Sequence, residues 1–316
     1  SWSGTSVLTG VNDTITARVI SGLAGNAEAS INVNYLPNVS VGITALQTNY
    51  ETNVQIITIS GTTRDVNSPD TIIVYVNGVY QSIVNLTSLN QNWSATVSLT
   101  GVNDSVTAQL QDQFGRTMYD TISVSYYGAL AVGITNPLTN HDTNISIVTI
   151  RGTSGRSGVN DTVALYVNGV YQNVSVITTL NGNWSATVTL TGVGDSVTAV
   201  INDRFGRTAY DTITVNYYAP ISIKITSPVT LHDTNTAIIA VKGTTNGSGI
   251  GDTIVIYTFT NANTTIIIHS GLNALFFGSA LLTGYGDSII AELHDRFGRI
   301  AADTITVNYF GTPSAV

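Results

Sequence analysis

Four aspartates recur at a nearly constant spacing and are the first candidates for chemistry. Asp13, Asp104, Asp195 and Asp287 each close a Thr-Gly-x-x-Asp phrase, and they follow one another by 91, 91 and 92 residues. Clustered carboxylate oxygens are the ligands that Ca²⁺ prefers. Each phrase, however, offers one carboxylate beside Gly and Asn, and Asp also caps turns by accepting hydrogen bonds from nearby backbone. We therefore expect turn capping and no cofactor, with Ca²⁺ at the domain joints as the alternative.

The histidines do not build a catalytic or metal-binding pattern. His141-Asp142 and His232-Asp233 are equivalent positions, but the preceding repeat has Tyr50-Glu51 there, so a nitrogen ligand is not kept. We interpret them as loop residues. No nucleophile stands beside a plausible base, and the acidic residues recur in every repeat, whereas an active site needs one special constellation. The sequence therefore predicts a protein that is not an enzyme.

A tryptophan recurs once per repeat. Trp2, Trp93 and Trp184 occupy equivalent places, each followed by Ser and a strand of alternating small and apolar residues. Such a ring can form a platform for stacking sugars, but a once-per-repeat aromatic is more often core packing or a plug at a domain junction. We expect the core position.

The chain is also rich in acceptor sequences for N-glycosylation. These Asn-x-Ser/Thr sequons matter only in an exported chain that meets a glycosylating enzyme. They are candidate sites for covalent glycans, and the asparagines are Asn12, Asn38, Asn85, Asn92, Asn103, Asn144, Asn160, Asn173, Asn183, Asn246 and Asn263.

The composition limits the function classes. Charged residues make up 9% of the 316 residues, and only Lys224 and Lys242 are lysines, whereas an ordinary domain has about 25% charged residues. Hydroxyl and amide groups, glycans or burial in an assembly must keep this surface soluble. A net charge of −8 gives no basic footprint for nucleic acid. The chain has no cysteine, and we expect no membrane span in it.

The repeat predicts the fold. Each copy contains an alternating strand, an Asp-x-Phe-Gly-Arg turn such as that at 112–116, and a second alternating strand, which together indicate a β-hairpin. Upstream, Tyr-Val-Asn-Gly-Val-Tyr at 75–80 and 166–171 favours a type I′ hairpin turn. About seven short strands in roughly 91 residues are typical of one immunoglobulin-like domain. We predict an all-β chain of tandem immunoglobulin-like β-sandwich domains that form a rod, because the joints are short.

The predicted boundaries follow the copies of the repeat. Residues 1–36 match only the last strands of a copy and form the C-terminal half of a domain, completed by upstream chain or by a neighbouring subunit through strand addition. The rest divides into a domain at 37–128, a domain at 129–219, a divergent domain at 220–311 and a tail at 312–316. In the divergent copy Tyr257 to Asn261 replaces the Asn-Gly hairpin and Phe276 replaces the tryptophan, which leaves its strand pairing there open.

The recurring phrases resemble a known family. Gly-Thr at 61–62, Tyr-Val-Asn-Gly, Trp-Ser, Gly-x-Asp-Ser and Asp-x-Phe-Gly resemble bacterial Ig-like domains of the glucodextranase domain B kind over residues 37–311. The resemblance implies an immunoglobulin-like sandwich of cell-surface adhesins, S-layer-associated proteins and accessory regions of secreted enzymes, without catalytic residues of its own. A fold-level resemblance of this kind says little about function.

The most apolar and least repeat-like segment lies in the divergent copy. Exposed strands of this character associate readily, so the segment either lies inside the domain or docks on another subunit. We predict an assembly interface formed by Ile266, Ile267, Ile268, Leu275, Phe276 and Phe277.

These observations favour a structural role outside the cell. We expect a non-enzymatic subunit of an extracellular or cell-surface filament, pilus-like thread or surface layer. Its partners would be further copies of the chain, joined end to end or by strand exchange. The alternatives are the stalk of a cell-surface adhesin, which would stay monomeric, and a carbohydrate-associated accessory module of a secreted enzyme.

Overall fold

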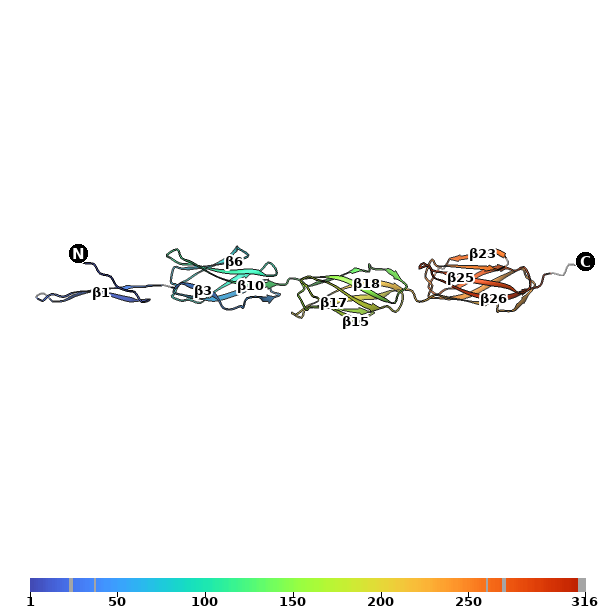
Figure 1. The fold of residues 1–316 in the computed structure, drawn as a ribbon, viewed down its shortest axis with the longest axis horizontal. Coiled ribbons are helices and arrows are strands. Elements are labelled where there is room, and N and C mark those ends of the chain that lie inside the picture. Colours follow the sequence, from blue (N-terminus) through green and yellow to red (C-terminus); the bar gives the residue numbers. More distant parts are fainter. Residues whose placement is uncertain (23–24, 37, 260, 269–270, 312–316) are drawn as a thin grey trace, which may run out of the picture. The chain divides into compact units, whose positions relative to one another are not determined.

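The fold is all-β throughout the described part of the chain. The computed structural model describes residues 1–22, 25–36, 38–259, 261–268 and 271–311, and these ranges contain 26 strands and no helix. Accordingly, no membrane-spanning helix occurs in those ranges. The chain divides into two units, Ser1–Ala129 and Leu130–Val316, which are drawn in Figure 1 and described separately below.

The first unit contains a lone hairpin and one sandwich. Strands β1 (Asp13–Val19) and β2 (Ala27–Val33) form the antiparallel N-terminal hairpin. Domain 1 follows, with a three-stranded sheet in the order β3-β5-β8 and a five-stranded sheet in the order β4-β10-β9-β6-β7. Its strands are β3 (Ser40–Ile43), β4 (Tyr50–Thr52), β5 (Ile56–Arg64), β6 (Thr71–Val76), β7 (Val79–Asn85), β8 (Trp93–Ser98), β9 (Asp104–Gln111) and β10 (Thr117–Tyr126).

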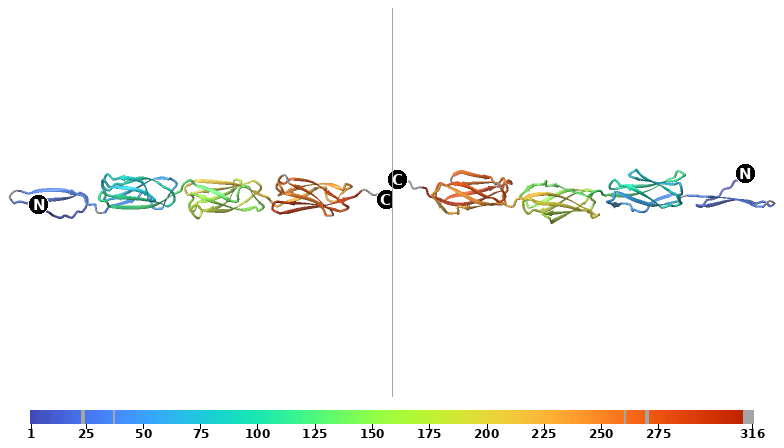
Figure 2. Two further views of the ribbon diagram at one scale, coloured as in Figure 1. Left: turned by 90° about the horizontal axis from the view of Figure 1, so that it is seen from above. Right: turned by 180° about the vertical axis from the view of Figure 1, so that it is seen from behind.

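The second unit contains two sandwiches of the same topology, drawn in green to yellow and in orange to red in Figures 1 and 2. Domain 2 comprises β11 (Ala131–Asn136), β12 (His141–Thr143), β13 (Ile147–Gly155), β14 (Thr162–Val167), β15 (Val170–Val176), β16 (Asn183–Thr189), β17 (Asp195–Asn202) and β18 (Thr208–Tyr217). Domain 3 comprises β19 (Ser222–Ser227), β20 (His232–Thr234), β21 (Ile238–Asn246), β22 (Thr253–Thr258), β23 (Asn261–Ile268), β24 (Leu275–Leu281), β25 (Asp287–His294) and β26 (Ile300–Tyr309).

Strand alternation and turn chemistry explain these elements. In β8 every second residue is buried and the others are exposed, as a strand with one face on a core requires. The β6–β7 turn uses Asn77 at φ 50° and Gly78 at φ 78°, the positive angles that a type I′ turn needs. Domain 3 keeps the equivalent hairpin without Asn-Gly, because Thr258 still pairs with Asn261 across the turn. Tandem immunoglobulin-like β-sandwiches are therefore present as predicted.

An aromatic ring on a glycine closes each core. Trp184 is 3% exposed and pairs with Gly152 of the neighbouring strand. A Cβ atom at Gly152 would collide with the indole ring and with the carbonyl oxygen of Gly133. Trp93 lies in the same way on Gly61, and Phe276 on Gly243. The prediction of a core position is therefore confirmed for Trp93 and Trp184.

The N-terminal hairpin keeps only part of this arrangement. Val19 and Ile31 are 59% and 63% exposed, although they correspond to the buried Leu110 and Ile122 of domain 1. The Trp2 ring is 75% exposed. The face that would line a sandwich core is thus open to solvent over the hairpin as described.

Removal of the Trp184 ring should destabilise domain 2. Trp184→Ala is expected to lower the free energy of unfolding of this domain by about 3–5 kcal/mol, because a large buried ring leaves a cavity. Trp184→Phe should lose much less, since Phe276 fills the same position in domain 3. Differential scanning calorimetry measures both effects. The control is Trp2→Ala, which removes an exposed ring and should leave the transitions unchanged; equal losses for Trp184→Ala and Trp2→Ala would contradict the core assignment.

Candidate functional site

The recurring aspartates are turn caps. Asp104 is 2% exposed. Its Oδ2 accepts from the Thr100 and Gly101 backbone N–H groups at 2.6 and 3.0 Å, and its Oδ1 accepts from the Thr100 hydroxyl and the Asn77 amide, both at 2.7 Å. Asp195 has the same four kinds of donor. These bonds confirm the turn-capping prediction.

The same residues do not gather into a larger acidic group. Across the described ranges no three His, Cys, Asp or Glu side chains come together in a way that could hold a metal ion. Ca²⁺ at the domain joints stays a prediction.

Opposing effects set the acidity of Asp195. Burial of the carboxyl group raises its pKa, but hydrogen bonds from Thr191, Gly192 and Asn168 favour the charged form and leave the pKa below its ordinary value of 3.8. A carboxyl whose pKa is lower in the folded state stabilises the protein above the unfolded-state pKa. This stabilisation is lost as the pH falls through the folded-state value.

Acid should therefore destabilise domain 2 partly through Asp195. We expect Asp195→Asn to lower the stability of this domain at neutral pH, because a carboxylate acceptor is lost, and to flatten the decline of its transition temperature below about pH 4. Calorimetry between pH 2 and pH 7 measures both. Glu28→Gln, which removes half of an exposed ion pair with Arg18, is the matched control and should leave the profile of domain 2 unaltered. A variant as acid-sensitive as the parent would show that the cap does not titrate.

The Asp-x-Phe-Gly-Arg turns of domains 1 and 3 hold the start of their domains. In domain 1, Asp112 accepts from the Arg116 backbone N–H and Nε, and Arg116 Nη1 donates to the Leu36 carbonyl oxygen at 2.8 Å. In domain 3, Arg299 donates in the same way to the Tyr218 carbonyl oxygen at 3.4 Å. These two turns thus fix the chain that enters domain 1 and domain 3.

A second arginine of the turn joins domains 2 and 3. Arg296 Nη1 donates to Asp142 Oδ2 at 2.6 Å and Nη2 donates to the Ile250 carbonyl oxygen at 2.5 Å. The guanidinium carbon also lies 4.7 Å from the centroid of the Tyr218 ring, within cation–π range. Burial lowers the pKa of Arg296, but the hydrogen bond that it donates to Asp142 and the charges of Tyr218, Asp142 and Asp252 together outweigh burial and raise the pKa overall. Together with the bond from Arg299 to the Tyr218 carbonyl oxygen, this contact links domains 2 and 3 of the second unit.

The joint contact gives a specific expectation. Arg296→Gln introduces the residue that domain 1 has at this position, Gln113, and removes the ion pair and the cation–π contact. We expect wider inter-domain distance distributions between spin labels placed on domains 2 and 3, without loss of either domain's thermal transition. Arg156→Gln, an exposed change in domain 2, is the control and should leave the distance distributions unchanged. Unchanged distributions in Arg296→Gln would show that the guanidinium does not restrain the joint.

The interpretation of His141 and His232 as loop residues is wrong. His141 and His232 lie in the three-residue strands β12 and β20, which pair in parallel with β18 and β26, and not in loops. Asp142 accepts from Asn216 as well as from Arg296. The available signal was that an acidic residue recurs at this position as Glu51, Asp142 and Asp233.

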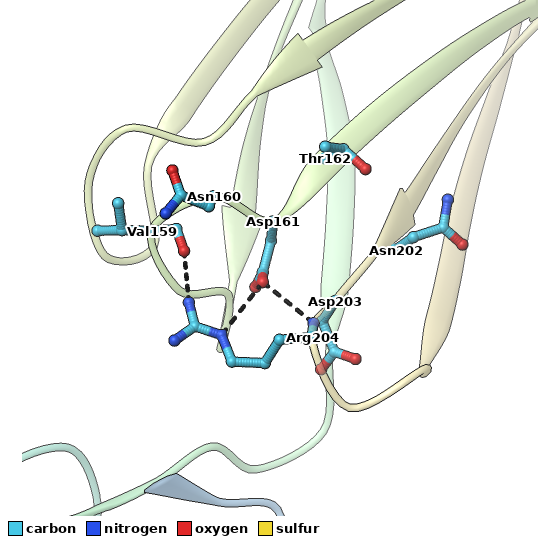
Figure 3. Close-up of a pocket in the computed structure, with 7 residues that line it drawn as sticks. All are labelled: Val159, Asn160, Asp161, Thr162, Asn202, Asp203 and Arg204. Atoms are coloured by element: carbon cyan, nitrogen blue, oxygen red, sulfur yellow. Dashed lines mark hydrogen bonds and ion pairs between the residues drawn. The ribbon is translucent and has the colours of Figure 1, made fainter. Parts of the chain in front are cut away.

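A hollow in domain 2 is lined by Val159, Asn160, Asp161, Thr162, Asn202, Asp203 and Arg204 (Figure 3). Its charged groups are engaged within the domain. Arg204 donates to the Val159 carbonyl oxygen at 2.6 Å, and the Arg204 backbone N–H and Nε donate to Asp161. Domain 1 has the same link from Gln113 N–H to Asp70. The hollow is therefore part of the repeat's internal bonding.

The sequon asparagines lie mainly at the surface. Asn173 is half-buried, its amide donating to Thr187 at 3.3 Å, and the side chain of Asn263 lies outside the described residues. The others are exposed, namely Asn12, Asn38, Asn85, Asn92, Asn103, Asn144, Asn160, Asn183 and Asn246. Glycosylation at these positions stays a prediction.

Strand alternation divides the predicted assembly interface. Phe276 is 1% exposed and belongs to the core, and Ile267 is half-buried against that core. Ile266, Leu275 and Phe277 are 66%, 66% and 61% exposed. The side chain of Ile268 lies outside the described residues. The surface part of the predicted interface is therefore Ile266, Leu275 and Phe277.

The comparisons with known proteins are limited to solved structures. No protein-family model matches the chain and no curated protein is significantly similar to it. The expected resemblance to glucodextranase domain B is thus not confirmed.

Several solved structures resemble the chain at low identity. One is a tetra-tandem repeat in the extending region of a large adhesion protein, at 17% identity, covering 86% of this chain and 74% of that one, with a TM-score of 0.36. Another belongs to a 1.5-MDa bacterial ice-binding adhesin, at 19% identity, 86% and 98% coverage and a TM-score of 0.31. A third is a chain in the crystal structure of Dpr2 Ig1-Ig2 in complex with DIP-Theta Ig1-Ig3. It has 10% identity, the match covers 85% of this chain and 99% of that one, and the TM-score is 0.46. All three TM-scores are below 0.5, and it is the chain's own strand pairing that establishes the fold.

Proposed function

We propose that this chain is a non-enzymatic structural subunit of an extracellular filament, pilus-like thread or surface layer. The observation that carries the proposal is a change of character on one face of domain 3. Leu275 and Phe277 flank the buried Phe276, whereas domains 1 and 2 have an Asn and a Ser around the buried tryptophan. A repeat that keeps its core but exchanges polar surface for apolar surface favours contact with another molecule.

Glycans complement this contact in the proposal. Asn92 and Asn183 are exposed sequon positions at the start of equivalent strands, and Leu275 stands at that place in domain 3. Sugars on the first two domains would cover a surface that carries little charge. The corresponding face of domain 3 has no sequon in the Leu275-Phe276-Phe277 segment and stays open for protein contact.

Strand complementation is a second route to assembly. The N-terminal hairpin exposes Trp2, Val19 and Ile31, whose equivalents in domain 1 are buried. Strands equivalent to β3–β7 of domain 1 would cover this face and would pair with the free edge of β1. In the proposal these strands come from upstream chain or from a neighbouring subunit.

The second candidate is the stalk of a cell-surface adhesin. It is favoured by domains 1 and 2, whose strand order and turn contacts are the same and whose polar groups are used internally. The accessory-module alternative loses its sugar platform, because the rings of Trp93 and Trp184 are each only 3% exposed. The filament hypothesis must therefore be tested against the hypothesis of a monomeric adhesin stalk.

Electron microscopy separates the two candidates. Negative-stain images of the native protein should show regular fibres or a lattice, and the purified chain should assemble likewise. Leu275→Gln with Phe277→Ser makes this face polar without creating a sequon, and it should prevent regular fibres or a lattice while the thermal transitions persist. Thr189→Ala, an exposed change in the equivalent strand β16 that leaves the Asn183 sequon intact, is the control and should assemble. Isolated monomers in the native preparation would refute the filament, and intact-mass spectrometry of the same sample reports sequon occupancy.

A further inference from the structure

Four exposed apolar side chains lie at one end of domain 3. They are Leu231, Phe259, Tyr285 and Phe310, exposed by 68%, 84%, 77% and 50%, and we call them the end cap. Leu231 N–H donates to the Thr306 carbonyl oxygen and Phe259 N–H to that of Ser288, and these acceptors are partners in the β25–β26 ladder. The rings of Tyr285 and Phe310 are 5.8 Å apart. Neighbouring strand ends therefore place the four side chains together.

The end cap is peculiar to domain 3. Equivalent backbone hydrogen bonds identify the residues that domain 2 has in these places. Asn140 stands for Leu231, Asn168 for Phe259, Val193 for Tyr285 and Tyr218 for Phe310. Two amides and a valine have thus been replaced by larger apolar groups at the same end of the same fold.

The backbone at Leu231 opposes this replacement. Asn49, Asn140 and Leu231 have φ angles of 64°, 61° and 62°, in the left-handed region that Asn tolerates and a leucine adopts only with strain. The side chain is nevertheless 68% exposed and gains nothing from the domain's own core. A strained, exposed leucine points to a role outside the domain.

The joint between domains 2 and 3 shows what such an end receives. Tyr218 is 8% exposed, and Phe297 and Arg296 from the turn of domain 3 contact its ring at 5.7 and 4.7 Å. Phe310 is the equivalent of Tyr218 but is half exposed. The end of a domain is therefore a surface that takes the β-hairpin turn of another domain of this kind.

The sequence between the two strands of the N-terminal hairpin is of matching character. Where the other domains have Asp-x-Phe-Gly-Arg, this hairpin has Ser-Gly-Leu-Ala-Gly at 21–25, without charge. Val19 and Ile20 beside it are 59% and 76% exposed. Exposed apolar side chains beside an uncharged sequence complement the end cap, just as the charged turn of domain 3 complements Tyr218 and Asp142.

We propose that the end cap of one molecule binds the N-terminal hairpin of a second copy of this chain, at Ile20 next to the end of β1, head to tail. The proposal rests on the proposed function and names a contact distinct from the Leu275 and Phe277 face. A heterologous contact of this kind repeats from copy to copy and yields chains.

Cross-linking tests the pairing directly. Because the chain has no cysteine, Ile20→Cys and Tyr285→Cys introduce the only thiols. With a short thiol–thiol cross-linker the double variant should give a ladder of covalent oligomers, and each single variant should give little product. Efficient dimers of Tyr285→Cys alone would show that two caps meet each other, and the absence of a ladder at high concentration would equally overturn the proposal.

Sedimentation velocity tests the energetics. The wild-type chain should associate with concentration, and Leu231→Asn with Tyr285→Val should weaken association at least tenfold. This variant introduces the residues of domain 2 and relieves the strain at position 231, so unfolding does not explain a loss. Leu275→Gln with Phe277→Ser should retain the head-to-tail step. Loss of association in the β24-face variant, with normal association of the end-cap variant, would overturn the end-cap proposal and leave the filament proposal standing. Absence of fibres from native samples, with the end-cap contact still present, would overturn the filament proposal and leave the end-cap contact standing.

Discussion

The closeness of an aromatic ring to a backbone glycine sets the geometry of each sandwich. Gly61, Gly152 and Gly243 leave no room for a Cβ atom, because the ring of the opposite strand and a carbonyl oxygen occupy that space. The ring in turn fills the core between the two sheets, where aliphatic side chains pack around it. Tryptophan and phenylalanine both satisfy this contact. The register of the β5–β8, β13–β16 and β21–β24 pairs is therefore fixed by packing, and the outer positions of those strands are free to differ.

Turn chemistry provides the second level of order in a chain with few charges. The buried carboxylates of Asp104 and Asp195 are surrounded by backbone and side-chain donors. Asp112 and Asp295 accept hydrogen bonds from Arg116 and Arg299 and so hold the turns at the start of their domains. Most of the charge in the domains is thus used in local hydrogen bonds. The outer faces are left to hydroxyl, amide and apolar groups, whose arrangement decides what the surface can bind.

Local signals in the sequence were sufficient for the fold but not for the joints. Period-2 alternation, Asn-Gly turns and the repeated tryptophan predicted the strands and the core, because each depends on residues near one another in the chain. The Arg296–Asp142 contact joins residues 154 positions apart, and it follows only when two domains are placed together. The apolar segment around Phe276 was treated as one surface, although alternation alone sends Phe276 inward and Leu275 and Phe277 outward. The end cap cannot be predicted from local patterns, because its four residues lie in separate loops.

The divergence of domain 3 follows from the physics of repeats. Identical polar domains have no reason to prefer one contact over another, and a surface with little charge has little electrostatic repulsion to select partners. Specific association then requires that apolar groups occur at some surfaces and are absent from equivalent ones. Domain 3 meets this condition at two places, the outer face of β24 and the end cap, while keeping the glycine–ring contact and the Asp287 turn cap. Leu231 makes the point most directly, because there the backbone favours asparagine and the side chain gains nothing within its own domain, so the replacement is explained by what the surface meets.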